Sequence, residues 1–203
     1  RQQTRFIGLF LLLLAVSILL YFFFTLRKTP TVTQTPIEII NTYTNSVDGF
    51  SIAYPKTFTL DSGYGYQGFG PQETIRGVSF VIPLAIATGT NLGNDSYISV
   101  EHIPKITTCT IGQFINLTQG AMPYTIIDGG ISYLVASSTD AGAGNRYEET
   151  VYVREGLTHC YAIRYFIQYG AIENYPKGLV VEFDKPSLLS AFDTIRRSLV
   201  ITQ

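Results

Sequence analysis

The 203-residue sequence has few of the side chains on which most catalytic and metal sites depend. It contains two histidines, two cysteines, one methionine and no tryptophan. The spacing of the histidines and cysteines suits no zinc motif. No Gly-x-Ser-x-Gly sequence is present, so the nucleophile elbow of many serine hydrolases is also absent. The sequence therefore carries no recognisable enzyme signature.

Charge is scarce as well, since only 14% of the residues are charged. Four of the 14 basic residues, Arg1, Arg5, Arg27 and Lys28, precede Glu38, which leaves 10 basic residues against all 15 acidic ones in the remainder. These 10 are scattered along the chain. Binding to nucleic acid or to an anionic membrane surface requires clustered cations, so neither is expected.

One stretch has no charge at all, from residue 6 to residue 26. In a helix, a run of this length spans roughly 30 Å, the thickness of the hydrocarbon core of a bilayer. No small-x-small cleavage site follows it, which favours an uncleaved anchor over a signal peptide. We therefore expect residues 1–5 to be a cytoplasmic flank and residues 6–26 a single-pass helix in the cell membrane, in contact with the lipid bilayer, with the following domain outside the cytoplasm.

Beyond this run the sequence predicts a short stalk and one domain. Residues 27–37 are rich in Thr and Pro, which favours an extended backbone, and residues 38–203 form the domain. Alternating apolar residues and frequent turn signals predict six or seven strands in the domain. The expected strands are 50–54 with a continuation at 57–60, 78–86, 97–103, 125–127, 131–137, 146–154 and 157–168, with a last short strand at 199–201. Glycine-containing turns at 129–130 and 155–156 predict hairpins, so the sheet should be mainly antiparallel.

Two segments predict helices. Residues 110–119 have apolar side chains at helical spacing and precede Gly120, a typical C-terminal cap. Residues 186–197 have one apolar face, Asp184 as the N-cap and two arginines in the last turn. The fold class predicted is therefore α+β: a single N-terminal transmembrane helix, followed by a mainly antiparallel six- or seven-stranded sheet flanked by helices.

The two cysteines, Cys109 and Cys160, both follow the apolar run. Outside the cytoplasm the expected outcome is a disulfide, whereas inside it they would be buried thiols. Cys109 lies at the start of the expected helix 110–119 and Cys160 on the expected strand 157–168. A helix that crosses the sheet on the face opposite His159 would bring the two together, and we expect the bridge.

Two segments at the ends of the domain resemble a known family. Residues 48–58, Asp-Gly-Phe-Ser-Ile-Ala-Tyr-Pro-Lys-Thr-Phe, are similar to the opening of many small bacterial envelope proteins. Residues 187–199 are similar to the closing helix and strand of the same proteins. Those proteins share the PsbP, Mog1 and DcrB type of fold, so the resemblance implies an antiparallel sheet flanked by helices. Because the members have unrelated functions, the resemblance implies no activity and no site residue.

Only His102 and His159 could act as a general base near neutral pH. Each is expected on a strand, in contact with neighbouring side chains. Together with Glu101 and the pair Glu148-Glu149 they could form a metal site across strands, but their spacing does not require one. We therefore assign no catalytic residue, no metal ligand and no cofactor.

The most distinctive segment is 63–70, Gly-Tyr-Gly-Tyr-Gln-Gly-Phe-Gly. Tyr64, Tyr66 and Phe69 supply rigid contact area on a flexible backbone, which suits recognition of a peptide, a glycan or a protein surface. The alternative is a connection whose aromatic side chains fold back onto the sheet.

The sequence thus predicts a membrane-anchored extracytoplasmic domain that acts by binding and is not an enzyme. The expected partners are an envelope protein, a peptide or a glycan, and not nucleic acid. Two alternatives stay open. One is an extracytoplasmic hydrolase or metal-dependent enzyme that uses His102 or His159, and the other is a structural subunit of an envelope assembly.

Overall fold

The computed structural model describes residues 39–70, 72–105, 108–117 and 122–202. The expected flank 1–5, membrane helix 6–26 and stalk 27–37 lie outside the described residues. Within the described part of the chain, none of the helices has the length and apolarity needed to cross a bilayer.

The fold is mostly β, which corrects the expected α+β class with flanking helices. Strands account for 49% and helices for 15% of the described structure. The described strands are β1 (Ile39–Asn45), β2 (Phe50–Pro55), β3 (Thr59–Asp61), β4 (Gly65–Tyr66), β5 (Ile75–Val81), β6 (Tyr97–Pro104), β7 (Tyr124–Asp128), β8 (Ile131–Gly142), β9 (Asn145–Glu155), β10 (His159–Gly170) and β11 (Val200–Ile201). Six or seven strands were expected, and the number was too low because β1 and the two-residue β4 were not predicted, and because β3, expected as a continuation of the strand at 50–54, is a separate strand that pairs with β5.

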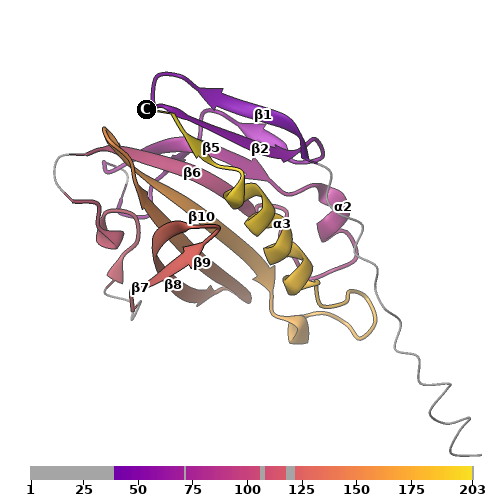
Figure 1. Ribbon diagram of the computed structural model, residues 1–203. Coiled ribbons are helices and arrows are strands. Elements are labelled where there is room, and N and C mark those ends of the chain that lie inside the picture. Colours follow the sequence, from indigo (N-terminus) through magenta and orange to yellow (C-terminus); the bar gives the residue numbers. More distant parts are fainter. Residues whose placement is uncertain (1–38, 71, 106–107, 118–121, 203) are drawn as a thin grey trace, which may run out of the picture. The chain divides into compact units, whose positions relative to one another are not determined.

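The described strands form two sheets, and within each sheet every pair of neighbouring strands is antiparallel. The large sheet has the order β3-β5-β6-β10-β9-β8-β7, with β4 paired to β5. The small sheet has the order β1-β2-β11 and lies against one face of the large sheet (Figure 1).

Three consecutive hairpins build the half of the large sheet from β7 to β10. Gly129 and Gly130, with φ of 59° and 81°, make the tight turn between β7 and β8, as the sequence predicts. The expected hairpin around Gly156 joins β9 and β10. Residues 138–145, which lie between the expected strands 131–137 and 146–154, extend β8 and β9 to the turn at Ala143-Gly144.

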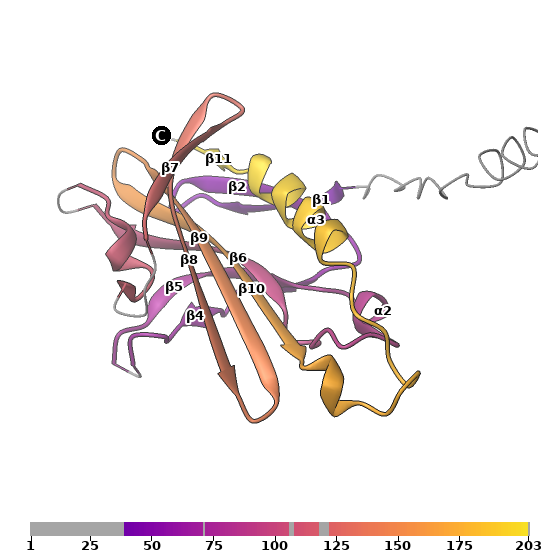
Figure 2. The ribbon, with the colours of Figure 1, turned by 90° about the horizontal axis from the view of Figure 1, so that it is seen from below.

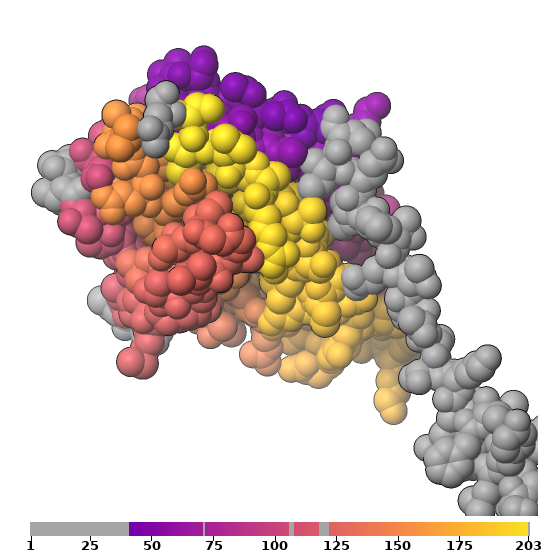
Figure 3. All heavy atoms as spheres, in the orientation of Figure 1, coloured from indigo at the N-terminus to yellow at the C-terminus, as the bar shows by residue number. Residues whose placement is uncertain are grey.

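The expected C-terminal helix is confirmed as α3 (Lys185–Arg197). The Asp184 side chain accepts a hydrogen bond from the Ser187 backbone N–H at 3.0 Å, which caps the helix. Figure 2 shows α3 beside the small sheet, on the side of the large sheet that the small sheet covers. In the space-filling view its surface lies between the small sheet and the β7–β8 hairpin (Figure 3).

The prediction of the other helix, at 110–119, is wrong over the residues that the structure describes, because no α-helix forms there. From residue 110 to residue 116 the chain forms one 3-10 turn, η1 (Ile111–Gln113), and no α-helix. One reason is that the Phe114 carbonyl, which a longer helix would use internally, accepts a hydrogen bond from Arg164 Nη2 at 2.5 Å.

The expected strand 78–86 is also interrupted. β5 ends at Val81, and Pro83, which has no N–H to donate to a sheet, leads into the four-residue helix α2 (Leu84–Ala87). A second short turn, η3 (Ile172–Asn174), follows β10.

Each face of the large sheet has its own apolar core. On the face that carries Ile163 and Tyr165 of β10, the covering residues come from the small sheet and α3, with Phe50 and Phe192 fully buried between the layers. The opposite face carries Cys160 and Ala162 and is covered by the segment around η1. Because β10 alternates between the two, neighbouring residues of one strand serve different cores.

Candidate functional site

The disulfide between Cys109 and Cys160 is present, as the sequence predicts. The two Cα atoms lie 5.5 Å apart, and the bridge links positions 51 residues apart in the chain. It ties the segment 108–117 to β10, on the face opposite His159. Ile111, Phe114 and Ile115 of this segment pack beside the bridge.

Next to the bridge on the same face, β10 carries a fully buried arginine between two carboxylates. Arg164 contacts Glu101 of β6 through two hydrogen bonds, Nε to Oε1 at 2.7 Å and Nη2 to Oε2 at 2.9 Å. Its Nη1 donates to Glu149 Oε2 of β9 at 2.7 Å. Arg164 and Glu101 have no exposed side-chain surface, and Glu149 is 18% exposed.

This network keeps its arginine charged but is not neutral. Burial by itself lowers the pKa of Arg164, yet the carboxylates of Glu101 and Glu149 more than compensate and the pKa is raised. Two carboxylates face one guanidinium, so one negative charge remains. Glu149 is the more exposed of the two carboxylates and faces the side from which a ligand could approach.

The aromatic residues of the segment 63–70 lie on this network. The Tyr64 hydroxyl donates to Glu101 Oε1 at 2.8 Å, and burial, followed by the charge of Glu101, raises the pKa of Tyr64. The Tyr66 ring covers the Arg164 guanidinium, with Cζ 3.4 Å from the ring centroid. Phe69 packs edge-on against Tyr66 at 6.0 Å. These side chains fold back onto the sheet, which is the alternative that the sequence leaves open for them.

The segment nevertheless forms one wall of a pocket. The pocket has a volume of about 310 Å³ and is lined by Tyr66, Gly68, Ile115, Asn116, Ser138, Asp140, Tyr147, Glu149 and Phe166. Three of these side chains are aromatic and two are carboxylates. Among the described residues of the lining there is no lysine, arginine or histidine.

Sequence reasoning missed most of this lining, because Asp140 lies beyond the end of the expected strand 131–137 and because Glu148 and Glu149 were grouped as one pair. On a strand, adjacent residues point to opposite faces. Glu149 lines the pocket, whereas Glu148 lies on the other face and pairs with Lys185 at 2.5 Å. The alternation along the expected strand 146–154 is the signal that places Tyr147 and Glu149 on one face.

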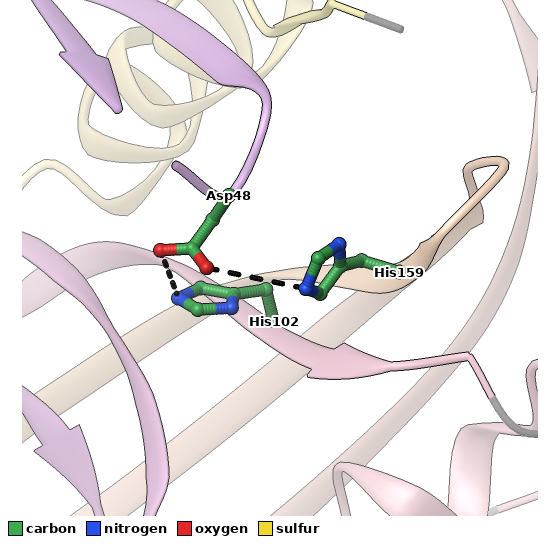
Figure 4. A group of neighbouring side chains, drawn as sticks. All are labelled: Asp48, His102 and His159. Carbon is green, nitrogen blue, oxygen red and sulfur yellow. Dashed lines mark ion pairs between the residues drawn. The ribbon is translucent and has the colours of Figure 1, made fainter. Parts of the chain in front are cut away.

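Figure 4 shows that the two histidines are brought together. Because His102 is opposite Tyr161 in the β6–β10 pairing, they lie on the face opposite the pocket. Both contact Asp48, which the sequence analysis did not single out. Burial lowers the pKa of His102, and the carboxylate of Asp48 opposes this shift. Glu101, grouped with the histidines in the sequence analysis, points away from them into the arginine network.

Comparisons with known proteins add little to this geometry. No protein-family model matches the chain, and no curated protein matches it. A crystal structure of a protein from Bacteroides thetaiotaomicron VPI-5482 is similar, with a TM-score of 0.48 and 12% sequence identity over 82% of this chain. The match spans 50% of the length of that chain. The resemblance to the PsbP type of fold stays a prediction.

Proposed function

We propose that the domain is an extracytoplasmic binding domain, and that its ligand carries an ammonium group that enters the pocket under the segment 63–70. The observation that carries this proposal is the composition of the pocket wall. Three aromatic rings and two carboxylates surround a space of about 310 Å³, with no cationic side chain among the described lining residues. Positive charge is the ligand property that such a wall favours.

The charge of the wall supports a cationic ligand. The Glu101–Arg164–Glu149 network has an excess of one negative charge, and Asp140 adds a second at the pocket. Glu149 is paired with Arg164, whereas Asp140 is exposed and no lysine, arginine or histidine is among the described lining residues, so an ammonium group would be attracted by the net negative charge at this position. The same charges would disfavour anionic ligands.

The aromatic side chains support the same ligand class. Phe166 stacks on Tyr97 with ring centroids 5.0 Å apart, and Tyr147 lies 6.3 Å from Phe166. These contacts hold the two rings at the pocket before a ligand arrives. A cation over such a ring gains about 0.5–2 kcal/mol, depending on how far it is desolvated.

A location outside the cytoplasm is supported by the disulfide. Bridges of this kind persist in oxidising compartments and are rare in reducing ones. The Cys109–Cys160 bridge also fixes the segment that supplies Ile115 and Asn116 to the pocket wall.

We propose binding rather than catalysis because the pocket and the histidines lie on opposite faces of the sheet. Phe166 of the pocket lies on the face of β10 that carries Cys160, whereas His159 lies on the opposite face, which carries Tyr161. Neither His102 nor His159 could therefore transfer a proton to a ligand in the pocket. The two carboxylates of the wall would act through their charge.

The test uses n-butylammonium as the probe and n-butanol as its neutral counterpart of similar shape. In a titration of the ¹⁵N-labelled full chain, the cation should cause saturable shifts in the amide signals of Ser138, Tyr147 and Phe166. The alcohol should bind at least about tenfold more weakly, since it lacks the charge. Asp140→Asn and Glu149→Gln should each weaken binding of the cation.

Asp95→Asn is the matched control, because Asp95 is exposed and does not line the pocket. It should leave binding of n-butylammonium unchanged. Equal affinity for the cation and the alcohol, or shifts that cluster away from the pocket, would contradict the proposal.

A further inference from the structure

Three side chains from distant parts of the sequence converge on the face opposite the pocket (Figure 4). Asp48 lies in the turn between β1 and β2, His102 lies near the end of β6, and His159 is the first residue of β10. In the β6–β10 pairing, His102 is opposite Tyr161. His159 is two residues before Tyr161, so both imidazoles project from the same face.

The ligand atoms are already close together. His102 Nε2 lies 3.3 Å from Asp48 Oδ2, and His159 Nε2 lies 3.9 Å from Asp48 Oδ1. The three ligand atoms lie within 4.8 Å of one another. In a tetrahedral zinc site with bonds of roughly 2.1 Å, ligand atoms are about 3.4 Å apart. Small side-chain movements, with no change of strand register, would bring the group to that spacing.

A second layer of hydrogen bonds holds the acidic member in place. Asn45 Nδ2 donates to Asp48 Oδ2 at 2.7 Å, and the Asp48 backbone N–H donates to Asn45 Oδ1 at 3.0 Å. The Tyr161 hydroxyl donates to the Asp48 carbonyl oxygen at 2.6 Å. Metal-binding side chains in proteins are commonly oriented by partners of this kind.

His159 has such a partner too. Its Nδ1 lies 3.0 Å from the Thr158 hydroxyl oxygen. The tautomer that donates Nδ1–H to Thr158 carries its lone pair on Nε2, the atom that faces Asp48. In this form His159 presents a free ligand atom to the centre of the group.

The donor set also identifies the class of ion. Two imidazole nitrogens and one carboxylate oxygen suit Zn²⁺ and similar transition metals, whereas Mg²⁺ and Ca²⁺ prefer sites made of oxygen atoms. The side chains of His102, His159 and Asp48 are 10%, 20% and 23% exposed. An ion could therefore enter from solvent and keep a water molecule as a further ligand.

We propose that Asp48, His102 and His159 form a Zn²⁺-binding site with three protein ligands. A bound ion would connect the β1–β2 turn of the small sheet to β6 and β10 of the large sheet. The site lies on the opposite face from the proposed ammonium pocket and does not depend on it, so either proposal can fail alone.

The chain offers a direct test because it contains only two histidines. The full chain is prepared without a histidine tag, freed of metal with a chelator, and titrated with ZnCl₂ while the imidazole signals are followed by ¹H–¹⁵N NMR. Both imidazoles should change together and saturate at one equivalent of Zn²⁺. Calorimetry should give the same stoichiometry, and Mg²⁺ or Ca²⁺ should not compete.

Substitutions locate the ion independently. His102→Ala, His159→Ala and Asp48→Asn should each weaken Zn²⁺ binding by about 100-fold or more, since each removes a direct ligand. Asp95→Asn, the same substitution at an exposed acid outside the group, should have no effect. Circular dichroism of each variant shows whether it is folded.

The NMR titration of the unmodified sequence decides the matter even if a variant does not fold. Zn²⁺ binding that leaves either imidazole unchanged would overturn the proposal. The same holds if no saturable binding is seen, or if folded variants bind Zn²⁺ as tightly as the wild type.

Discussion

The two faces of the large sheet reach their stability in different ways. The Ile163 face packs apolar side chains from the small sheet and α3 into one extended core that includes Phe50 and Phe192. The Arg164 face has a smaller apolar cluster, and beside it lie the disulfide and a buried guanidinium held by two carboxylates. One strand, β10, supplies both faces by simple alternation.

This difference separates the part of the molecule that builds the fold from the part suited to binding. The face covered by the small sheet and α3 is mostly apolar, and its buried arginine, Arg196, belongs to the covering helix and not to the large sheet. On the other face, the described cover is the segment around η1 and the aromatic side chains of the segment 63–70, and charged side chains approach the surface through Glu149. Burying those charges is unfavourable unless they are paired. The stability of the face that carries Arg164 therefore depends on each member of the ion-pair network being present.

The largest effect is expected from breaking the buried ion pair. Arg164→Met removes the cation and leaves Glu101 buried and unpaired, which should lower the free energy of unfolding by roughly 3–5 kcal/mol. Urea unfolding at neutral pH measures the change. Replacing Glu101 by Gln in the same chain should restore part of the loss, since the unpaired charge is then gone.

Arg146→Met is the matched control for this variant. Arg146 is 51% exposed and lies 3.5 Å from Glu173. Loss of such a surface pair should cost less than about 1 kcal/mol. A similar cost for Arg146→Met and Arg164→Met would contradict the proposed importance of pairing on the polar face.

Removing the disulfide should have the next largest effect. Cys109→Ala together with Cys160→Ala opens a link between positions 51 residues apart, and roughly 2–4 kcal/mol of unfolding free energy should be lost. Urea unfolding without reductant compares the variant with the wild type. Adding a reductant that opens the bridge should bring the wild type close to the variant, and a variant as stable as the oxidised wild type would show that the bridge contributes little.

The sequence predicts well those features that depend on local patterns. The Gly129-Gly130 hairpin, the capped helix α3 and the strands around them follow from turn residues and apolar periodicity within a few residues. The disulfide was also predicted, because an extracytoplasmic location and two cysteines leave one pairing.

The features that were missed arise from contacts between distant residues. The expected helix at 110–119 stops after η1, where Arg164, about 50 positions later, binds the Phe114 carbonyl. Asp48 could not be grouped with His102 and His159 because only the stacking of the two sheets brings its turn to them. The apolar periodicity of one segment contains no information on contacts with distant segments.

The smallest effect on stability is expected on the face that carries Ile163, at the ion pair between Arg196 of α3 and Asp128. The Arg196 side chain is buried, and its guanidinium reaches Asp128 near the surface. Arg196 Nη2 lies 2.5 Å and Arg197 Nε 2.8 Å from Asp128 Oδ2, and these hydrogen bonds lower the pKa of Asp128. A carboxyl group whose pKa is lower in the folded state stabilises the fold above its unfolded pKa of about 3.9, and this contribution is lost as the pH falls through the folded value. Asp128→Asn should therefore lower the melting temperature slightly at pH 7, and the difference from wild type should shrink below about pH 4. Asp95→Asn, at an exposed acid, should show no such trend. If the difference between Asp128→Asn and wild type is constant from pH 7 to about pH 2, the charge of Asp128 is not what stabilises this end of α3.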